Sequence, residues 1–365
     1  MKKTIAVLAG DGIGPEVMVE GIRVLDSVAQ KFGHDFEYDY ALVGGAAFEV
    51  FGEHCPISTI ETCANADAIL FGSVGGPVNA QDDQKWKNCE ANSILALRKE
   101  FKFNINIRPI AMIPSLMDIS PLKAKVVQPK ADIVIFRELN GDIYFGAHEQ
   151  GVDDNGVRYA TDVAEYNEHQ IASIVHQAFK ATQNRGKHLT SVDKANVLAT
   201  SKLWRTIVDE IAPQYSDVKV SHMYVDNCAM QMIVNPSQFD VIVTANLFGD
   251  ILSDLGAVLP GSLGLIPSVS LNAEGFGLYE PSGGSAPDIA GQGKANPIAQ
   301  ILSAAMMLEY SFNMLEEANA IYQAVNRALT SGKRTIDIVG SDAVAVSLSQ
   351  MADAIIAEIM EASLV

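Results

Sequence analysis

The feature that most constrains the fold is a recurring unit made of an apolar run, a polar or glycine-rich turn and a helical pattern. The first unit passes from Thr4–Ala9 through Gly10-Asp11-Gly12-Ile13-Gly14 into a helix opened by Pro15-Glu16. Similar strand-like runs recur at Ala68–Phe71, Asp132–Phe136, Leu189–Val192, Lys219–Val225 and Asp240–Thr244. Because strands alternate with helices, the pattern predicts an α/β fold with a largely parallel central sheet.

Two long segments interrupt this alternation. Glu138–Tyr166 is polar and contains four spaced glycines, which is typical of hairpin strands that project as an arm. Such an arm usually pairs with another chain, although a simple surface hairpin has the same pattern. Leu259–Asn296 is rich in Gly, Pro and Ser, and we expect a functional loop there. Three helical patterns follow it, at Pro297–Leu308, Met314–Thr330 and Asp342–Met360.

Charge and hydropathy exclude several classes of partner. The chain has 26 Lys and Arg against 44 Asp and Glu, a formal net charge of −18, which repels nucleic acids and anionic lipids. No apolar run approaches the roughly 18 residues of a membrane span. The first apolar stretch, Ile5–Ala9, is too short for the core of a signal peptide. We therefore expect a cytoplasmic protein that binds neither nucleic acid nor membrane.

The four cysteines do not form a recognisable metal or disulfide pattern. They are scattered without a Cys-x-x-Cys pair, so we interpret them as buried or incidental thiols. They are Cys55, Cys63, Cys89 and Cys228.

Charged residues follow three of the predicted strands. Asp193 and Lys194 follow Leu189–Val192, Asp226 follows Lys219–Val225, and Asp250 and Asp254 come after Asp240–Thr244. Asp250 and Asp254 are spaced i, i+4 and share one face if this segment is a helix, where like charges cost stability unless a cation lies between them. With Asp226 they make three hard oxygen ligands that suit Mg²⁺ or Mn²⁺. The alternative is a solvated acidic helix face.

Three arginines form a second candidate cluster. Arg98 lies in a helical pattern, Arg108 follows the apolar Phe103–Ile107, and Arg137 ends Asp132–Phe136. Guanidinium groups bind carboxylates in a bidentate manner, so three converging arginines would suit a small polycarboxylate that also chelates a metal. The sequence leaves open whether they converge or form separate surface salt bridges.

Several well-known catalytic motifs are missing from the sequence. It has no G-x-x-x-x-G-K-[ST] loop, no G-x-S-x-G elbow and no H-E-x-x-H helix, and Gly10–Gly14 is not G-x-G-x-x-G. A phosphotransferase that binds a Mg²⁺-nucleotide is therefore disfavoured. A non-catalytic acidic binding protein stays open as an alternative of another class.

Two longer motifs resemble a known family. Asn246-Leu247-Phe248-Gly249-Asp250-Ile251-Leu252-Ser253-Asp254 and Gly284-Ser285-Ala286-Pro287-Asp288-Ile289-Ala290-Gly291, continuing to Ala295-Asn296-Pro297, resemble motifs of the β-hydroxyacid oxidative decarboxylases, which include isocitrate and 3-isopropylmalate dehydrogenases. The resemblance extends from Gly10 to the final helices. It implies that family's two-domain fold with a parallel or mixed central sheet, which is not a Rossmann fold. A cofactor-binding domain would comprise residues 1–104 and 262–365. A substrate, metal and dimerisation domain would comprise 105–261, with the arm at about 138–166.

The resemblance also implies roles for the charged residues. Arg98, Arg108 and Arg137 would bind the malate carboxylates, and Asp226, Asp250 and Asp254 would hold Mg²⁺ or Mn²⁺. Lys194 and Tyr144 would be the acid–base pair, with Asp226 beside them in the catalytic centre. For Tyr144 a packed arm aromatic is the alternative. Lys194 and Asp226 would come from the second subunit of a homodimer, so that each site is shared.

NAD would lie on Ser73–Glu90 and on Gly284–Asn296 by the same resemblance. An acid at Asp288 would accept the ribose hydroxyls and repel a 2′-phosphate, which favours NAD over NADP. The chain departs from the common pattern at Val78-Asn79, Gly283 and Leu255. The expected cofactor contacts are Ser73, Gly76, Pro77, Glu90, Glu280, Gly284, Ser285, Ala286, Pro287, Asp288, Ile289 and Asn296.

Apolar residues indicate the substrate within the family. Ile94 and Leu95 precede Arg98 on the helix that begins at Glu90, itself an expected substrate contact, and Val197 would complete an apolar wall. A third substrate carboxylate would be unpaired against this wall, so isocitrate should be rejected. The expected reaction is the NAD-dependent oxidative decarboxylation of (2R,3S)-3-isopropylmalate to 4-methyl-2-oxopentanoate and CO₂ in leucine biosynthesis. Tartrate, malate, homoisocitrate and isocitrate remain alternative substrates.

Overall fold

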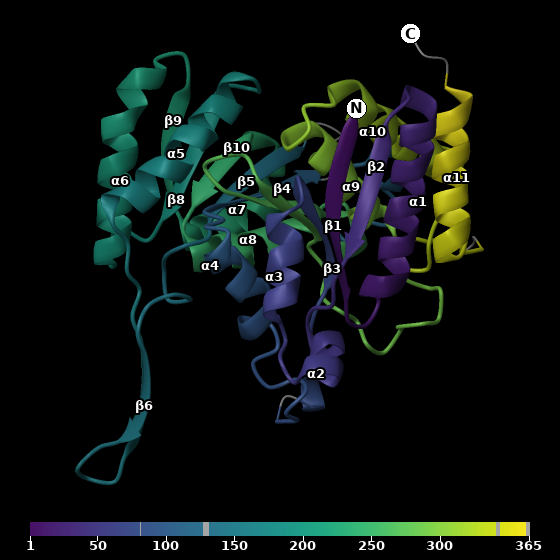
Figure 1. Ribbon diagram of the computed structural model, residues 1–365. Helices are drawn as coiled ribbons and strands as arrows, with labels where there is room; N and C mark the ends of the chain where they lie inside the picture. Colours follow the sequence, from purple (N-terminus) through teal and green to yellow (C-terminus); the bar gives the residue numbers. More distant parts are fainter. Residues whose placement is uncertain (81, 127–130, 341–343, 363–365) are drawn as a thin grey trace.

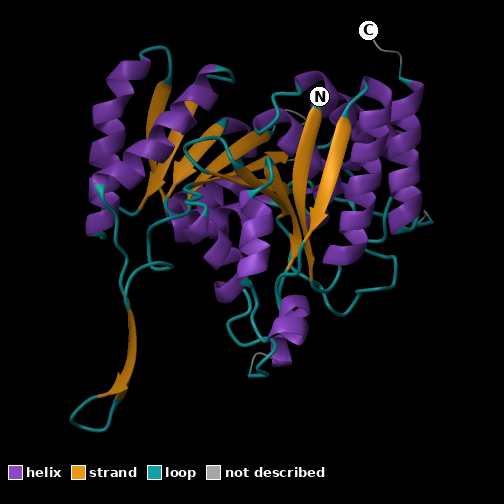
Figure 2. Cartoon of the chain, viewed as in Figure 1, coloured by secondary structure: helices purple, strands orange, loops and turns teal. Residues whose placement is uncertain are grey.

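One mixed sheet organises the chain in the computed structural model, which describes residues 1–80, 82–126, 131–340 and 344–362 (Figures 1 and 2). Within these ranges ten strands form the sheet in the order β2-β1-β3-β12-β11-β4-β5-β10-β8-β9. Their bounds are β1 Lys2–Gly10, β2 Asp35–Tyr40, β3 Ala68–Ser73, β4 Ile105–Ala111, β5 Asp132–Glu138, β8 His188–Asp193, β9 Lys219–Tyr224, β10 Val241–Thr244, β11 Pro267–Leu271 and β12 Gly277–Pro281.

The strand direction reverses in the middle of the sheet. Strands β1, β2, β3 and β12 pair in parallel, as do β5, β10, β8 and β9. Strand β11 is antiparallel to both β12 and β4, and β4 is antiparallel to β5. The predicted α/β fold with a largely parallel sheet is confirmed. Because of this reversal, the strands of the two parallel halves run in opposite directions.

Helices cover both faces of the sheet (Figure 1). Helices α1 (Gly14–Phe32), α9 (Ile298–Tyr310), α10 (Leu315–Thr330) and α11 (Leu348–Glu361) pack against one another. Helices α5 (Glu168–Gln183) and α6 (Ala199–Ile211) form a second pair, and α7 (Val225–Val234) and α8 (Asn246–Gly256) a third. The shorter helices are α2 (Gly45–Phe51), α3 (Ile57–Ala64) and α4 (Ala96–Glu100), and a π-helical turn at Ala91–Leu95 precedes α4.

Alternation along the strands separates two kinds of sheet face. In β1, Ile5 and Val7 belong to the largest apolar core, whereas Ala6 and Leu8 belong to a smaller cluster on the other face. In β4 and β5 the largest core again takes alternate residues, including Ile107 and Phe136. Asn106, Arg108 and Arg137 alternate with these residues, so the central strands present polar side chains to the opposite face.

The region after residue 259 differs from the prediction. The loop expected at Leu259–Asn296 contains β11 and β12, which lie at the centre of the sheet. These strands are five residues long, and their Gly, Pro and Ser residues conceal the period-two pattern. The helices predicted at Pro297–Leu308 and Met314–Thr330 are confirmed as α9 and α10. The predicted start at Asp342 lies outside the described residues. Helix α11 begins only at Leu348, after Ser347 caps it.

The arginines of the central strands lie within those strands, which differs from the prediction. Arg108 was expected just after a strand at Phe103–Ile107, but it lies inside β4. Arg137 lies inside β5, one residue before its end.

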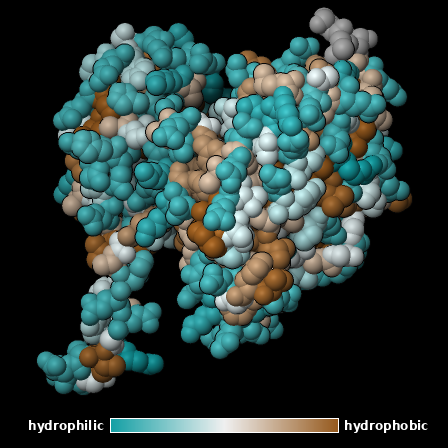
Figure 3. Space-filling view, viewed as in Figure 1, coloured by the Kyte–Doolittle hydropathy of each residue, from teal (hydrophilic) through white to brown (hydrophobic). Residues whose placement is uncertain are grey.

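The predicted hairpin arm is present but shorter than expected. Strands β6 (His148–Val152) and β7 (Arg158–Asp162) pair with each other alone and project away from the body (Figure 2). Figure 3 shows apolar surface near the tip among hydrophilic residues, and Val152 and Val157 are exposed there.

The four cysteines are free thiols, as predicted. Within the described ranges, no helix has the length and apolar character that crossing a bilayer requires.

A close backbone approach at Gly10 gives a stability prediction. Gly10 has a φ of +72°, and a Cβ there would lie 1.9 Å from the Ser73 carbonyl oxygen. Gly33 has a φ of +74° with nothing within 4 Å, so it isolates the cost of the backbone conformation. We expect Gly33→Ala to lose about 1 kcal/mol of unfolding free energy and Gly10→Ala at least about 3 kcal/mol, measured by urea denaturation. Equal losses would contradict this interpretation of Gly10.

Candidate active site

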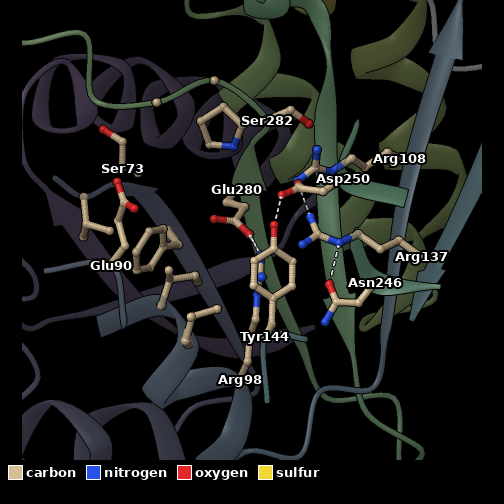
Figure 4. A pocket seen from close by; sticks show the side chains of 18 residues that line it. Ser73, Glu90, Arg98, Arg108, Arg137, Tyr144, Asn246, Asp250, Glu280 and Ser282 are labelled. Carbon is tan, nitrogen blue, oxygen red and sulfur yellow. Dashed lines mark hydrogen bonds and ion pairs between the residues drawn. The ribbon is translucent and has the colours of Figure 1, made fainter. Parts of the chain in front are cut away.

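A cavity of about 370 Å³ opens where the two halves of the sheet meet (Figure 4). Its charged and polar lining comes from segments that are distant in sequence. Strand β3 contributes Ser73, α4 contributes Arg98, and α8 contributes Asn246 and Asp250. The other labelled residues are Glu90, Arg108, Arg137, Tyr144, Glu280 and Ser282.

Three buried guanidinium groups meet at this cavity. Arg98 donates to Glu280 over 3.2 Å. Arg108 donates to Ser253 Oγ over 2.6 Å and to Asp254 over 3.2 Å. Arg137 donates to Asn246 Oδ1 over 2.9 Å and also forms an ion pair with Asp250. The arginines that the sequence left as separate candidates therefore line one pocket.

The cations at this cavity repel one another. Burial, followed by the charges of Arg108 and Arg98, lowers the pKa of Arg137 from its ordinary value. The Nε atom of Arg98 is buried and has no hydrogen-bond partner among the described residues. A pocket that concentrates positive charge and leaves a donor open favours an anion with more than one carboxylate.

Asp250 and Asp254 lie one turn apart on α8, as the spacing predicted. Burial acts to raise the pKa of Asp250, but Arg137 and Arg108 outweigh it and hold the pKa below its ordinary value. Burial raises the pKa of Asp254 and outweighs the opposing charge of Arg108, whose guanidinium lies 3.2 Å away, and the Asp250 charge adds to that rise. These carboxylates are the hard oxygen donors that a divalent cation such as Mg²⁺ prefers. Among the described residues, however, no group of three or more Asp, Glu, His or Cys side chains could hold a metal ion.

Tyr144 joins the carboxylates to the arginines. Its hydroxyl donates to Asp250 Oδ2 over 2.9 Å, and the Arg137 guanidinium carbon lies 5.6 Å from the centre of its ring. Burial and then the Asp250 charge raise the pKa of Tyr144. The hydroxyl is therefore kept protonated and able to donate, and the interpretation of Tyr144 as a merely packed arm aromatic does not account for this placement.

Lys194, Asp226 and Val197 form a separate group. Lys194 Nζ lies 2.8 Å from Asp226 Oδ1, and the Asp226 side chain is 67% exposed. Val197 is 64% exposed, and none of the three residues lines the cavity. A single chain therefore does not bring the predicted acid–base lysine, the third metal ligand or the end of the apolar wall to the arginines.

Apolar residues line the cavity beside the charged ones. Ile94 and Leu95 lie in the π-helical turn before α4, and Glu90 at the start of this segment also lines the cavity. Ile94, Leu95 and Arg98 all line this one cavity. The expected apolar wall is therefore present in part, without Val197.

A second cavity adjoins the first one and shares Ser73, Pro281, Gly283 and Gly284 with it. Its lining includes five residues predicted to contact the cofactor: Ser73, Gly284, Ala286, Ile289 and Asn296. Glu90 and Glu280 line the first cavity instead. Gly76 lies against Trp86, and Ser285 accepts a hydrogen bond from Ile13 N through its carbonyl oxygen. Gly76, Pro77, Ser285, Pro287 and Asp288 are not among the lining residues.

The second cavity has a polar edge that the sequence did not indicate. Asp337 accepts hydrogen bonds from Ser262 Oγ over 2.5 Å and Asn296 Nδ2 over 3.1 Å. A donor and acceptor pair at the edge of an otherwise apolar cavity suits a purine or ribose. Asp337 lies in a segment without a periodic pattern, so nothing in the sequence marked it.

Two further residues behind the arginines were also missed. Asn246 begins α8, lines the first cavity and binds Arg137. Glu138 is completely buried and accepts from the backbone N–H groups of Asn140 and Gly141 over 2.7 and 2.8 Å. Burial raises the pKa of Glu138 to about 7 despite these hydrogen bonds. A charged residue at the end of a buried strand was the available signal for Glu138.

Sequence comparison relates the chain to dehydrogenases. The profile of the family described as isocitrate/isopropylmalate dehydrogenase matches residues 4–355. A 3-isopropylmalate dehydrogenase from Haemophilus influenzae is 51% identical over 354 residues, covering 95% of this chain and 96% of that protein. One from Mannheimia succiniciproducens is 52% identical over 340 residues, covering 92% and 93%.

Solved structures have the same architecture. An isocitrate dehydrogenase from Methylococcus capsulatus superimposes with a TM-score of 0.86 at 31% identity, covering 98% of this chain and all (100%) of that one. A beta-decarboxylating dehydrogenase from Thermococcus kodakarensis superimposes with a TM-score of 0.78 at 34% identity, covering 98% and 96%.

Glu138 gives a prediction about stability and pH. The native state keeps the Glu138 proton up to a pKa of about 7, whereas the unfolded chain releases it near 4.5. Between these values the native state binds more protons, so this residue makes stability fall as the pH rises. We expect the loss of unfolding free energy between about pH 5 and pH 8 to be about 2–3 kcal/mol larger for the wild type than for Glu138→Gln. Parallel stability curves from denaturation at each pH would contradict the buried, titrating carboxyl.

Proposed function

Because the chain belongs to the isocitrate/isopropylmalate dehydrogenase family, we infer that it catalyses the oxidative decarboxylation of 3-isopropylmalate in leucine biosynthesis. One observation carries the choice of substrate. Three buried arginines and the Asp250 carboxylate share a cavity with Ile94 and Leu95, so an anion-binding pocket lies directly beside apolar side chains. This combination suits a malate with two carboxylates and a branched alkyl group.

The arginines bind and orient the substrate in this proposal. Arg98, Arg108 and Arg137 take the two malate carboxylates, and Ile94 and Leu95 contact the isopropyl group. Isocitrate would place a third carboxylate against these apolar side chains, where it would have no partner and lose affinity. Holding both carboxylates also fixes C2 and C3 relative to the groups that move protons.

Asp250 and Asp254 would hold a divalent metal, Mg²⁺ or Mn²⁺, with Asp226 as a further ligand. Their oxygen donors fit such an ion. When bound, the metal would supply Lewis-acid polarisation of the oxygen at C2. The family requires a nucleotide cofactor, and we propose NAD, which would accept a hydride from C2. The second cavity beside Ser73 and Gly284 has the position and the apolar lining for it. Asp288, in the same loop, would disfavour a 2′-phosphate.

The protons move through two side chains of the protein. Lys194 accepts the proton of the C2 hydroxyl, and Tyr144 donates a proton to C3 after CO₂ leaves. Substrate and NAD⁺ then yield 4-methyl-2-oxopentanoate, CO₂ and NADH. The raised pKa of Tyr144 supports its role as a donor, because its hydroxyl stays protonated near neutral pH.

A homodimer with shared sites accounts for the position of Lys194 and Asp226. In one chain they lie outside the cavity, and two acids there are too few to complete a metal site. Apolar side chains on α7 and α8 are exposed beside them, including Met230 and Ile251 at 53% and 56%. We propose that these helices and the arm of one subunit pack against the other subunit, which brings Lys194, Val197 and Asp226 to the partner's arginines.

The proposal also includes a division of the chain into a cofactor domain (1–104, 262–365) and a dimerisation domain (105–261). It further includes a cytoplasmic location.

A steady-state assay tests the reaction. With NAD and Mn²⁺, we expect NADH formation from 3-isopropylmalate, with a kcat/KM at least about 100-fold above that for isocitrate. EDTA should abolish turnover and added Mn²⁺ should restore it. A preference for tartrate, malate, homoisocitrate or isocitrate, or turnover that survives demetallation, would contradict the proposal.

Mixed subunits test the shared site. Lys194→Ala and Tyr144→Phe chains should each be nearly inactive, because each dimer loses one group from both sites. When equal amounts are unfolded and refolded together, half of the dimers contain one intact site, so activity should recover to about a quarter of the wild type. Lys202→Ala, an exposed lysine on the neighbouring helix α6, is the matched control and should keep full activity alone. No recovery from the mixture would place Lys194 and Tyr144 in the same subunit's site.

A further inference from the structure

The carboxyl of Glu138, at the end of β5, is buried at a cost in free energy. It is completely buried, and its partners are the backbone N–H groups of Asn140 and Gly141 and the hydroxyl of Tyr166 rather than a cation. Taking a carboxylate out of water without a counter-ion is strongly unfavourable. Such a group persists where it organises the segments around it, and the segment that it holds leads directly to Tyr144.

Tyr166 connects this carboxyl to the helix that carries the metal-type aspartates. Its hydroxyl oxygen accepts a hydrogen bond from the backbone N–H of Asn246, the first residue of α8, over 2.9 Å. Its ring packs edge-on against Trp204, with 5.7 Å between ring centres, and covers Gly141, where a Cβ would lie 2.2 Å from the ring. The ring is held by packing, so the hydroxyl is presented to Asn246 at a fixed position.

The two segments that Tyr166 touches are joined at further points. Asn246 Nδ2 donates to the carbonyl oxygen of Gly141 over 3.1 Å. Asp142 accepts from the backbone N–H of Leu247 over 2.9 Å. One of these segments continues to Tyr144, and the other continues to Asp250. The 2.9 Å hydrogen bond between Tyr144 and Asp250 therefore depends on how the loop after β5 sits on the start of α8.

We propose that Tyr166, supported by Glu138, is a positioning residue that sets the Tyr144 hydroxyl against Asp250 for proton donation. It acts through the loop and the helix and does not itself touch substrate or cofactor. The proposal rests on the proposed function, in which Tyr144 donates the proton to C3. A merely structural Tyr166 would contribute to stability and leave the rate per folded active site unchanged.

Tyr166→Phe is the direct test because it removes the hydroxyl and keeps the ring. In purified full-length enzyme with 3-isopropylmalate, NAD and Mn²⁺, we expect kcat to fall about tenfold while KM for NAD changes less than about twofold. The Tyr144→Phe variant already lacks the hydroxyl that donates the proton. In that background, adding Tyr166→Phe should lower kcat by less than about twofold relative to Tyr144→Phe alone. This non-additivity is the readout that a structural role would not produce.

Tyr322→Phe is the matched control. Tyr322 lies on α10, and its hydroxyl donates a hydrogen bond to Glu309 over 2.7 Å. Tyr322 lines a different cavity from the two described above. It should lose a comparable amount of stability and keep the wild-type kcat at a temperature where all variants are folded.

Three results would overturn the positioning role. They are an unchanged kcat for Tyr166→Phe, an equal loss of kcat for Tyr322→Phe, and a full tenfold loss when Tyr166→Phe is added to Tyr144→Phe. Wild-type enzyme that is inactive on 3-isopropylmalate would instead refute the proposed function, so the two failures are distinguishable.

Discussion

The balance of buried charge between the central arginines and the carboxylates of α8 is the interaction on which the site depends. Arg108 and Arg137 stand on neighbouring strands, and they are tolerated there because Asp250 and Asp254 face them. Removing either set would leave uncompensated charge in a region where it is costly. The apolar residues of this face form two separate clusters, with Ile110 and Ile135 in one and Leu139 in the other, and the arginines and the pocket lie between them.

The pocket lies in the middle of the sheet, where residues at or just after the carboxyl ends of strands from both halves line it. In an open parallel sheet, ligand sites collect at the carboxyl ends of the strands. Here β3 and β12 approach from one half, while β5 and the turn after β10 approach from the other. A ligand bound between them would touch both halves of the chain. That arrangement suits a reaction in which a nucleotide and a small acid must meet.

Much of the fold and part of the site could be predicted from the sequence. The α/β order, helices α9 and α10 and the hairpin arm followed from local periodicity and turn residues. The i, i+4 spacing put Asp250 and Asp254 on one helix face, and recognition of longer motifs identified the family. Strands β11 and β12 were missed because Gly, Pro and Ser residues hide their alternation. Their place in the sheet depends on long-range pairing with β3 and β4.

By itself, the sequence determined which residues carry charge and, apart from β11 and β12, which segments form the main helices and strands, because spacing and turn chemistry are local. Only the tertiary structure decided which of these residues meet. It gathered Arg98, Arg108 and Arg137 with Tyr144 in one cavity and left Lys194 beside Asp226 outside it. It also selected Glu138 and Tyr166, which carry no motif, and it gave Asn246, the first residue of a quoted motif, its contact with Arg137. Their roles arise from hydrogen bonds between segments that are distant in the chain, and such contacts leave no periodic pattern in a single sequence.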